Sequence, residues 1–174
     1  RVEKEKKDLY SYANEKLVTE LLDVLDNFER ALDQEGQGDS FKEGMEMIFR
    51  ELKEKSNLTV VFHHNDVSIP KDMEEHLFRI VQEIVSNTLK HARAQQMDVF
   101  LHQEGKQLHL RMVDDGIGFE QEKLERLSYG LKNIQERVED MAGTIKIRTS
   151  PQKGVAVDIR VPLLVKDKNE QSVF

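Results

Sequence analysis

The stretch "RMVDDGIGFE" (residues 111–120) places two acidic residues directly before a Gly-x-Gly, at the end of an apolar run. Asp and Gly are common turn residues, so the simplest interpretation is a strand that runs into a tight turn. Three further stretches in the same half of the chain favour a second interpretation, in which the acidic residue and the glycines belong to a binding pocket.

Composition excludes several classes of protein. The chain has 174 residues, a formal net charge of −7 and no cysteine. The acidic balance argues against nucleic acid as a general partner, and the lack of cysteine excludes disulfides and thiolate metal sites. No apolar run approaches the roughly 18 residues of a transmembrane helix, and no secretory signal opens the chain. We therefore expect a cytoplasmic protein. Because the chain starts without Met inside a charged helical pattern, we also expect it to be part of something longer.

Residues 1–55 have the pattern of two helices separated by the polar break "DQEGQGDS" (33–40), in which Asp39 or Ser40 is a candidate cap for the second helix. The two apolar stripes consist of Leu17, Leu21, Val24, Leu25, Phe28 and Leu32, and of Phe41, Met45, Ile48, Phe49 and Leu52. A hairpin this small buries too little apolar area to be stable alone. We expect a dimer in which two hairpins form a four-helix bundle. An intramolecular contact with the second half of the chain is the alternative.

From residue 58 onward, strand and helix patterns alternate. Residues 58–64 read as a strand, 97–115 and 144–164 as two strand pairs, and 166–174 as a polar tail. Residues 69–94 read as a long helix with Pro70 near its start and Asp72 as a candidate cap. Residues 129–143 read as a helix closed by Gly143. This order predicts the α+β class, an α/β sandwich with helices on one face of a mostly antiparallel sheet.

The long predicted helix carries a polar row. In "QEIVSNTLKHA" (82–92), Glu83 and Asn87 are four residues apart and share a face, as do Asn87 and His91, with Lys90 beside them. The row is either a solvated helix face or an oxygen-ligand site for Mg²⁺, which prefers amide or carboxylate oxygens together with phosphates and water.

Two glycine-bearing stretches complete the set. "YGLKN" (129–133) puts Gly130 immediately before a predicted helix, where free N–H groups can receive a phosphate; an ordinary helix start is the alternative. Lys153-Gly154 lies in the last predicted hairpin, where an ordinary turn is the simplest interpretation.

Together and in this order, these stretches resemble the ATP-binding domain of sensor histidine kinases, a Bergerat-fold (GHKL) domain shared with gyrase, Hsp90 and MutL. "QEIVSNTLKHA" is similar to its N box, "DDGIGF" to its first glycine box, "YGLKNIQERV" to its second, and "TSPQKGVAVDIRVPL" to its closing glycine hairpin. The resemblance covers about residues 58 to 165. It is strongest to the kinases that pair with NarL-type response regulators, in the LiaS/VraS branch of cell-envelope-stress sensors.

The resemblance implies that residues 56–165 bind ATP and Mg²⁺ and belong to a two-component kinase anchored in the cell membrane. Such a kinase transfers the γ-phosphoryl group to a histidine and then to a response regulator. Asp114 would accept a hydrogen bond from the adenine amine, Asn87 would hold Mg²⁺, and Glu83 would orient or deprotonate the nucleophile. The other ATP-binding residues implied are Lys90, His91, Gly116, Gly118, Tyr129, Gly130, Leu131, Lys153 and Gly154.

Two departures from the family pattern matter. The segment between Gly118 and Gly130 is too short for a separate F box, and Val155 follows Gly154 where many relatives have Thr. A hydroxyl contact near the adenine is therefore in doubt.

The first half resembles a different family. "RVEKEKKDLYSYANEKLVTELLDVLDNFERALDQ" and "FKEGMEMIFRELKEK" are similar to GrpE, the nucleotide exchange factor of the Hsp70 chaperone, where such segments form the end of a long paired helix and a dimeric four-helix bundle. The β-rich domain by which GrpE contacts Hsp70 has no counterpart. We infer an engineered chimera that forms a homodimer through residues 1–55, a natural fusion being the alternative.

The six histidines decide what the first half can do. All of them, at positions 63, 64, 76, 91, 102 and 109, lie beyond residue 55. The first half thus offers no phosphoacceptor histidine, and we expect ATP binding without autophosphorylation. The functions kept as alternatives are a chaperone exchange-factor fragment, a non-catalytic dimerisation scaffold and a Bergerat-fold ATP hydrolase.

Overall fold

The computed structural model describes residues 1–6, 8–9, 16, 19, 40–126 and 129–163. The apolar stripe expected between residues 17 and 32, the candidate cap Asp39 and the tail 166–174 lie outside these residues. The elements are α2 (Ser40–Lys55), β1 (Thr59–His64), α3 (Lys71–Asn87), the π-helical turn η1 (Thr88–Ala92), β2 (Gln96–Glu104), β3 (Gln107–Asp114), the 3-10 helix η2 (Gln121–Arg126), α4 (Tyr129–Asp140), β4 (Thr144–Thr149) and β5 (Val155–Pro162).

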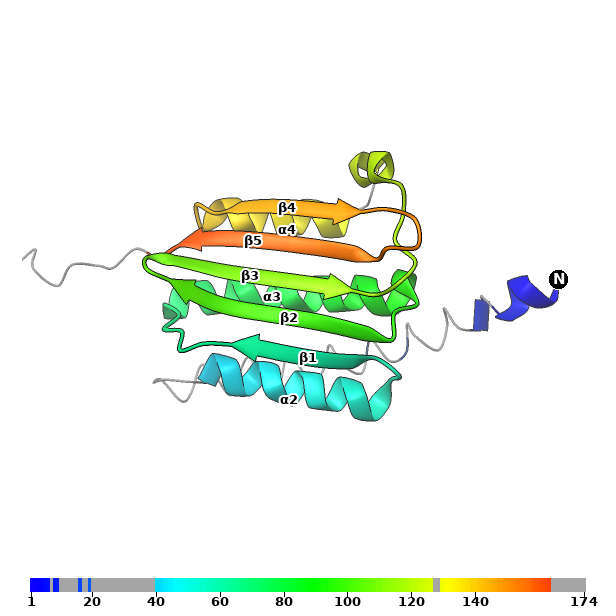
Figure 1. The fold of residues 1–174 in the computed structure, drawn as a ribbon, viewed down its shortest axis with the longest axis horizontal. Helices are drawn as coiled ribbons and strands as arrows, with labels where there is room; N and C mark the ends of the chain where they lie inside the picture. The colour runs from blue at the N-terminus through cyan, green and yellow to red at the C-terminus, as the bar shows by residue number, and fades with distance from the viewer. Residues whose placement is uncertain (7, 10–15, 17–18, 20–39, 127–128, 164–174) are drawn as a thin grey trace, which may run out of the picture.

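The five strands form one mixed sheet in the order β1-β2-β3-β5-β4. β1 pairs with β2 in parallel, and the other neighbouring strands are antiparallel. In Figure 1, α3 and α4 lie behind the sheet and α2 lies beside the edge strand β1. The expected α+β class, with a helical layer on one face of a mostly antiparallel sheet, is confirmed.

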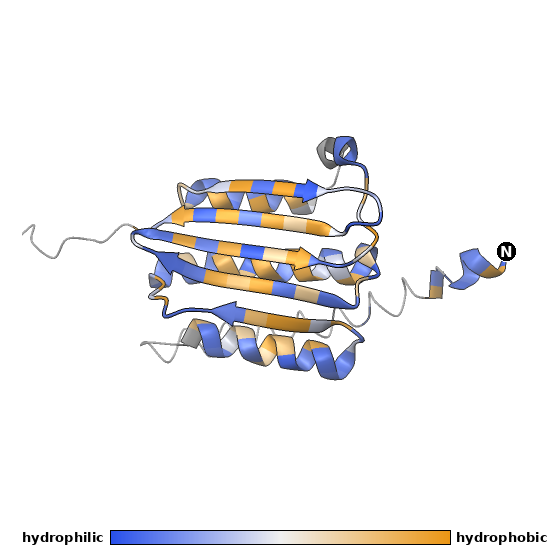
Figure 2. Cartoon of the chain, in the orientation of Figure 1, coloured by the Kyte–Doolittle hydropathy of each residue, from blue (hydrophilic) through white to orange (hydrophobic). Residues whose placement is uncertain are grey.

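Hydrophobic and hydrophilic residues alternate along most of the strands (Figure 2), and this period-2 pattern determines which side chains form the core. Cross-strand pairs such as Val99 with Met112 and Leu110 with Ile159 place apolar residues in continuous rows. The buried apolar residues of the three central strands are Met97, Val99, Leu101, Leu108, Leu110, Met112, Val157, Ile159 and Val161. Leu77, Ile80 and Val81 of α3 belong to the same apolar core.

Helix α2 contributes its apolar stripe to this core. Met45 and Leu52 are completely buried, the ring of Phe41 packs on Phe78 of α3 at 4.6 Å, and that of Phe49 packs on Phe62 of β1 at 5.4 Å. Of the two alternatives for this stripe, the structure shows the intramolecular contact. The apolar face that residues 40–55 would bring to a four-helix bundle is already covered by β1 and α3 of the same chain.

The start of α3 differs from the prediction. Asp72 is not the cap: the N-cap position is Pro70, no side-chain capping bond is formed, and the backbone N–H of Met73 donates to Pro70 O at 2.9 Å. Asp72 instead lies in the first turn, where its negative charge still favours the positive end of the helix.

Both predicted helix ends also differ. The helix expected to run to residue 94 changes at Thr88 into a π-helical turn that ends at Arg93, which has a left-handed backbone (φ 50°). After α4, the left-handed residue is Ala142 (φ 55°) and not Gly143, whose N–H donates to Val138 O at 2.9 Å. Gly143 therefore closes the helix through this bond. It lies one position after the residue with the positive φ, where a glycine is usual.

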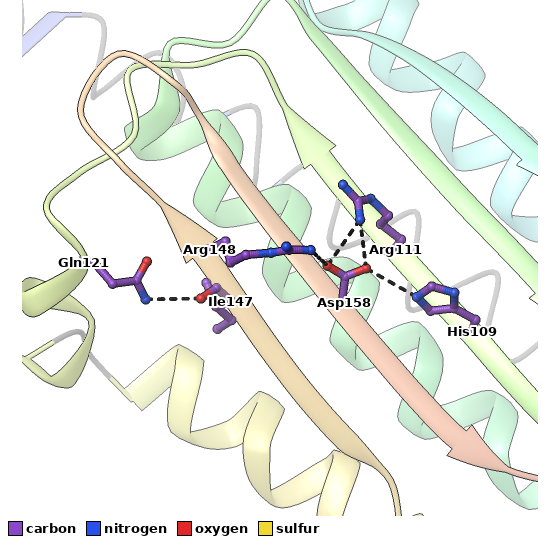
Figure 3. A network of polar contacts seen from close by, with 6 residues as sticks. All are labelled: His109, Arg111, Gln121, Ile147, Arg148 and Asp158. Carbon is purple, nitrogen blue, oxygen red and sulfur yellow. Dashed lines mark hydrogen bonds and ion pairs between the residues drawn. The ribbon is translucent and has the colours of Figure 1, made fainter.

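The face of the sheet opposite the helices carries a charged cluster around Asp158 of β5 (Figure 3). Its carboxylate receives hydrogen bonds from Arg148 of β4 at 3.1 Å and Arg111 of β3 at 3.3 Å, and lies 3.3 Å from Nε2 of His109. Burial alone would raise the pKa of Asp158, but Arg148, Arg111 and His109 together hold it below its usual value. The cluster ties β3, β5 and β4 together.

None of the helices within the described ranges combines the length and apolarity that crossing a bilayer requires.

Candidate functional site

A cavity of about 320 Å³ opens between the helical layer and the sheet, a volume at the lower end of the range typical of small-molecule sites. Most of the side chains around it are apolar. Its lining consists of Ile84, Asn87, Thr88, His91 and Ala92 from α3 and η1, Met97, Met112 and Asp114 from β2 and β3, Gly118 and Phe119 from the following loop, Leu131 and Ile134 from α4, and Ile147, Val155 and Val157 from β4 and β5.

Asp114 is the acidic group in this lining. It is the last residue of β3 and points to the same face as the buried Met112, so that it is only 6% exposed. Its Oδ1 accepts a hydrogen bond from the N–H of Gly116 at 2.8 Å. Burial raises the pKa of Asp114, backbone hydrogen bonds from Gly116 and Val155 partly offset the rise, and the charge of Asp115 adds to it. A buried carboxylate in an apolar cavity is stabilised by a ligand that donates a hydrogen bond to it.

The loop after Asp114 is fastened to the helical layer and to the last hairpin. The N–H of Ile117 donates to Ala92 O at 2.8 Å, at the end of the π-helical turn. The N–H of Gln152 donates to Ile117 O at 2.6 Å. Three segments far apart in the sequence thus meet at one side of the cavity.

Gly154 fits against Asp114 so closely that a Cβ there would overlap the Asp114 carbonyl oxygen, and its φ of 68° is left-handed. We expect Gly154→Ala to destabilise the protein more than Gly105→Ala. Gly105 has a similar φ of 59° but nothing within 4 Å of its Cβ position. The control should lose only the backbone cost of about 1–2 kcal/mol, and Gly154→Ala more, as measured by urea unfolding. Equal losses would contradict a tight contact at Asp114.

Glu83 and Gly130 meet at another side of the site. Glu83 is half-buried on α3, and its carboxylate packs so closely on Gly130 that a Cβ at Gly130 would overlap it. One turn after Glu83, Asn87 lines the cavity, and so does His91 one turn later. The predicted polar row therefore runs along the edge of the cavity.

The other predicted site residues are placed less uniformly. Gly118 and Leu131 line the cavity, whereas Gly116 is not part of the lining and packs closely against the backbone of Ala92. Lys90 and Lys153 are exposed and are not part of the lining. The side chain of Tyr129 lies outside the described part of the structure.

Sequence reasoning missed most of the apolar lining. Met112 was identifiable in principle, because the period-2 alternation places it on the same face as Asp114. Met97 lies opposite Asp114 on the neighbouring strand, which the sequence alone does not show. Phe119, Ile134 and Ile147 join the site only through tertiary packing. Val155, which stands where many members of the resembled family have Thr, lines the cavity, so this position supplies no hydroxyl.

Comparison with known proteins identifies two matching family models. The model for the histidine kinase-, DNA gyrase B-, and HSP90-like ATPases matches residues 72–165, and the GrpE model matches residues 1–61. The chain is 33% identical over 134 residues to the sensor histidine kinase LiaS of Bacillus subtilis, covering 77% of this chain and 37% of that protein. It is 40% identical over 129 residues to the sensor protein VraS of Staphylococcus aureus, covering 74% of this chain and 37% of that protein.

Solved structures share the fold. The histidine kinase domain of the Erythrobacter litoralis EL346 blue-light activated histidine kinase aligns with a TM-score of 0.63 at 19% identity, over 84% of this chain and 73% of that one. The Acinetobacter baumannii histidine kinase AdeS aligns with a TM-score of 0.61 at 15% identity, over 84% and 77% of the two chains. The chain spans just over a third of the length of the curated relatives described above.

Proposed function

Because the chain belongs to the family of histidine kinase-, DNA gyrase B- and HSP90-like ATPases, we propose that it binds ATP in the cavity beside Asp114 as the catalytic domain of a sensor histidine kinase. In the parent protein this domain would transfer the γ-phosphoryl group to a histidine, which would pass it to a response regulator. The observation that carries the proposal is the buried carboxylate of Asp114 in a mostly apolar cavity.

The adenine ring fits this site chemically. Its exocyclic amine would donate to Asp114, and its faces would lie among apolar side chains such as Met112 and Ile134. Guanine has a carbonyl oxygen at the position of that amine, so the carboxylate would face an acceptor and remain buried without a donor. The site should therefore select ATP over GTP.

The phosphates would extend toward the polar row formed by Glu83, Asn87 and His91, with Lys90 near them. Among the described residues, no group of three His, Cys, Asp or Glu side chains is placed to hold a metal ion. A single protein oxygen, that of Asn87, would still suit Mg²⁺, because this ion takes most of its ligands from phosphates and water. When bound, the ion would neutralise charge on the phosphates.

Protein groups on both sides of the phosphates would position the reaction. Glu83 would orient or deprotonate the attacking nucleophile, and its packing against Gly130 links it to the start of α4. Gly130 and Leu131 would close around the phosphates, with Tyr129 beside them. Lys153 and Gly154 would flank the adenine side of the site.

The direct test is calorimetric titration of ATP and of GTP with Mg²⁺. We expect ATP to bind about 10- to 150-fold more tightly than GTP, the value of one hydrogen bond to a charged group. Equal binding of the two nucleotides, or binding of neither, would refute the proposed site.

For the first half we propose a GrpE-derived segment, residues 1–55, joined to the ATPase domain in a chimera. The GrpE match over residues 1–61 supports this. Because the stripe of α2 is buried within the chain, a homodimer would form through the residues that precede it. Without a histidine in this segment, the chain should bind ATP without forming phosphohistidine, which a radiolabelled, acid-labile product would contradict. Hsp70 would be a partner of the parent GrpE only.

A further inference from the structure

Gln121, the first residue of η2, forms two hydrogen bonds with the free edge of β4. Its side-chain Nε2 donates to Ile147 O at 3.1 Å, and its Oε1 accepts from the N–H of Thr149 at 2.9 Å (Figure 3 shows the first). Only one orientation of the amide satisfies both bonds. The side-chain amide thus supplies the donor and the acceptor that one residue of a neighbouring parallel strand would supply.

The hydroxyl of Thr149 makes a second connection to the same loop. It accepts a hydrogen bond from the N–H of Phe119 at 3.1 Å and donates to Gly154 O at 2.9 Å. Phe119 and Ile147 both line the cavity. The contacts of Gln121 and Thr149 therefore hold a cavity-lining aromatic residue and the segment that follows it against β4.

The anchor itself is well held. β4 pairs along its length with β5, and Arg148, between the two residues that bond Gln121, is bound to Asp158 on the far face of the sheet. Asp158 is in turn bound to β3 through Arg111. Movement of residues 119–121 away from the cavity consequently requires either the contacts of Gln121 and Thr149 to break or β4 to separate from β5.

We propose that Gln121 and Thr149 are positioning residues that keep Phe119 over the cavity and slow the release of bound nucleotide. The proposal rests on ATP as the ligand of this cavity. A residue that only covered the strand edge would affect stability or solubility and would leave the nucleotide release rate unchanged.

The test is the release rate of a fluorescent ATP analogue with Mg²⁺, displaced by excess ATP in a stopped-flow instrument. We expect Gln121→Ala to speed release about 3- to 10-fold, the effect of losing one or two exposed hydrogen bonds. Gln121→Glu should do the same, because a carboxylate cannot donate to Ile147 O. The exposed neighbour Glu122 provides the control, and Glu122→Ala should release at the rate of the unmodified chain.

Thr149 gives an independent pair of variants. Thr149→Val removes the hydroxyl and should speed release, whereas Thr149→Ser keeps it and should not. Release from Gln121→Ala and Thr149→Val at the unmodified rate would overturn the proposal, even if both variants melted at lower temperature.

Amide exchange measured by NMR without nucleotide separates the contact from the ligand. The N–H of Thr149 should exchange faster in Gln121→Ala than in Glu122→Ala, because it faces solvent at the sheet edge once the side-chain acceptor is gone. Unchanged exchange would overturn the contact. An unmodified chain that binds no nucleotide would overturn the proposed function and the role in release together, and exchange at Thr149 would still decide whether the contact exists.

Discussion

Leu52→Ala is expected to lower the free energy of unfolding by about 2–5 kcal/mol, the range for truncating a buried leucine. Leu52 is completely buried in the core that α2 forms with the sheet and α3, whereas Met47 on the same helix is 47% exposed. Met47→Ala should therefore change the stability by no more than about 0.5 kcal/mol. Urea unfolding of the two variants and of the unmodified chain measures the difference.

The same comparison distinguishes a contact within the chain from a contact between chains. In a chain that begins at Ser40, the loss caused by Leu52→Ala should persist, since every partner of the stripe described here lies after residue 40. A loss that disappeared together with residues 1–39 would show instead that the stripe is buried in a bundle between chains. A chain that begins at Leu58 should not fold cooperatively, because α2 is missing from its core.

Asp114→Asn is expected to weaken ATP binding about 10- to 150-fold and to remove the preference over GTP. The carboxylate offers only acceptors to the adenine amine, whereas the asparagine amide can turn its own N–H₂ toward it. The backbone N–H of Gly116 donates to Oδ1, an oxygen acceptor that asparagine can retain, so the pocket should stay intact. Calorimetric titration with ATP and GTP measures both effects.

Asp114→Asn should affect the stability of the protein in the opposite direction from its effect on ATP binding. Because burial raises the pKa of Asp114, the folded state favours the protonated carboxyl group. This contribution to stability is fully present below the unfolded-state pKa and is lost as the pH rises through the folded-state pKa. Above the folded-state pKa the ionised Asp114 therefore costs stability, and there Asp114→Asn should unfold at an equal or higher urea concentration than the unmodified chain.

The neighbouring carboxylate gives a matched control. Asp115 is exposed and accepts hydrogen bonds from the N–H groups of Gln95 and Gln96 at 2.8 and 2.9 Å, outside the cavity. Asp115→Asn should keep the selectivity for ATP. If both variants lost ATP binding equally, the effect would belong to the loop as a whole and not to a contact between Asp114 and the base.

Local sequence patterns predicted the main helices and strands, whereas the place of Asp114 in a pocket was implied only by the resemblance to the kinases. The alternation from Gln107 to Asp114 places every second residue in the core, and a carboxylate at the last inward position has to enter whatever space lies there. The spacing of Glu83, Asn87 and His91 likewise placed these residues on one face of a helix. Such inferences need only the period of the element.

Contacts between distant segments were not predictable in the same way. The stripe of α2 has the same period whether it faces β1 or a second chain, so periodicity alone did not identify its partner. The π-helical turn at Thr88 depends on the packing of the helix end, and Ala142 at a left-handed position has no signature in its residue type. The role of Gln121 depends on its contact with the free edge of β4, which its residue type does not indicate.

The position of α2 also has a consequence for how such proteins are divided. The GrpE match ends at residue 61, inside β1, and the ATPase match starts at residue 72, yet α2 and β1 share one core with α3. In the proposed chimera, the border between the two families would therefore run through a single folding unit. Cutting the chain between the two matched regions would separate α2 and at least part of β1 from α3, with which they share the core. A helix of GrpE origin would be accepted at this place because its apolar residues pack on β1 and α3.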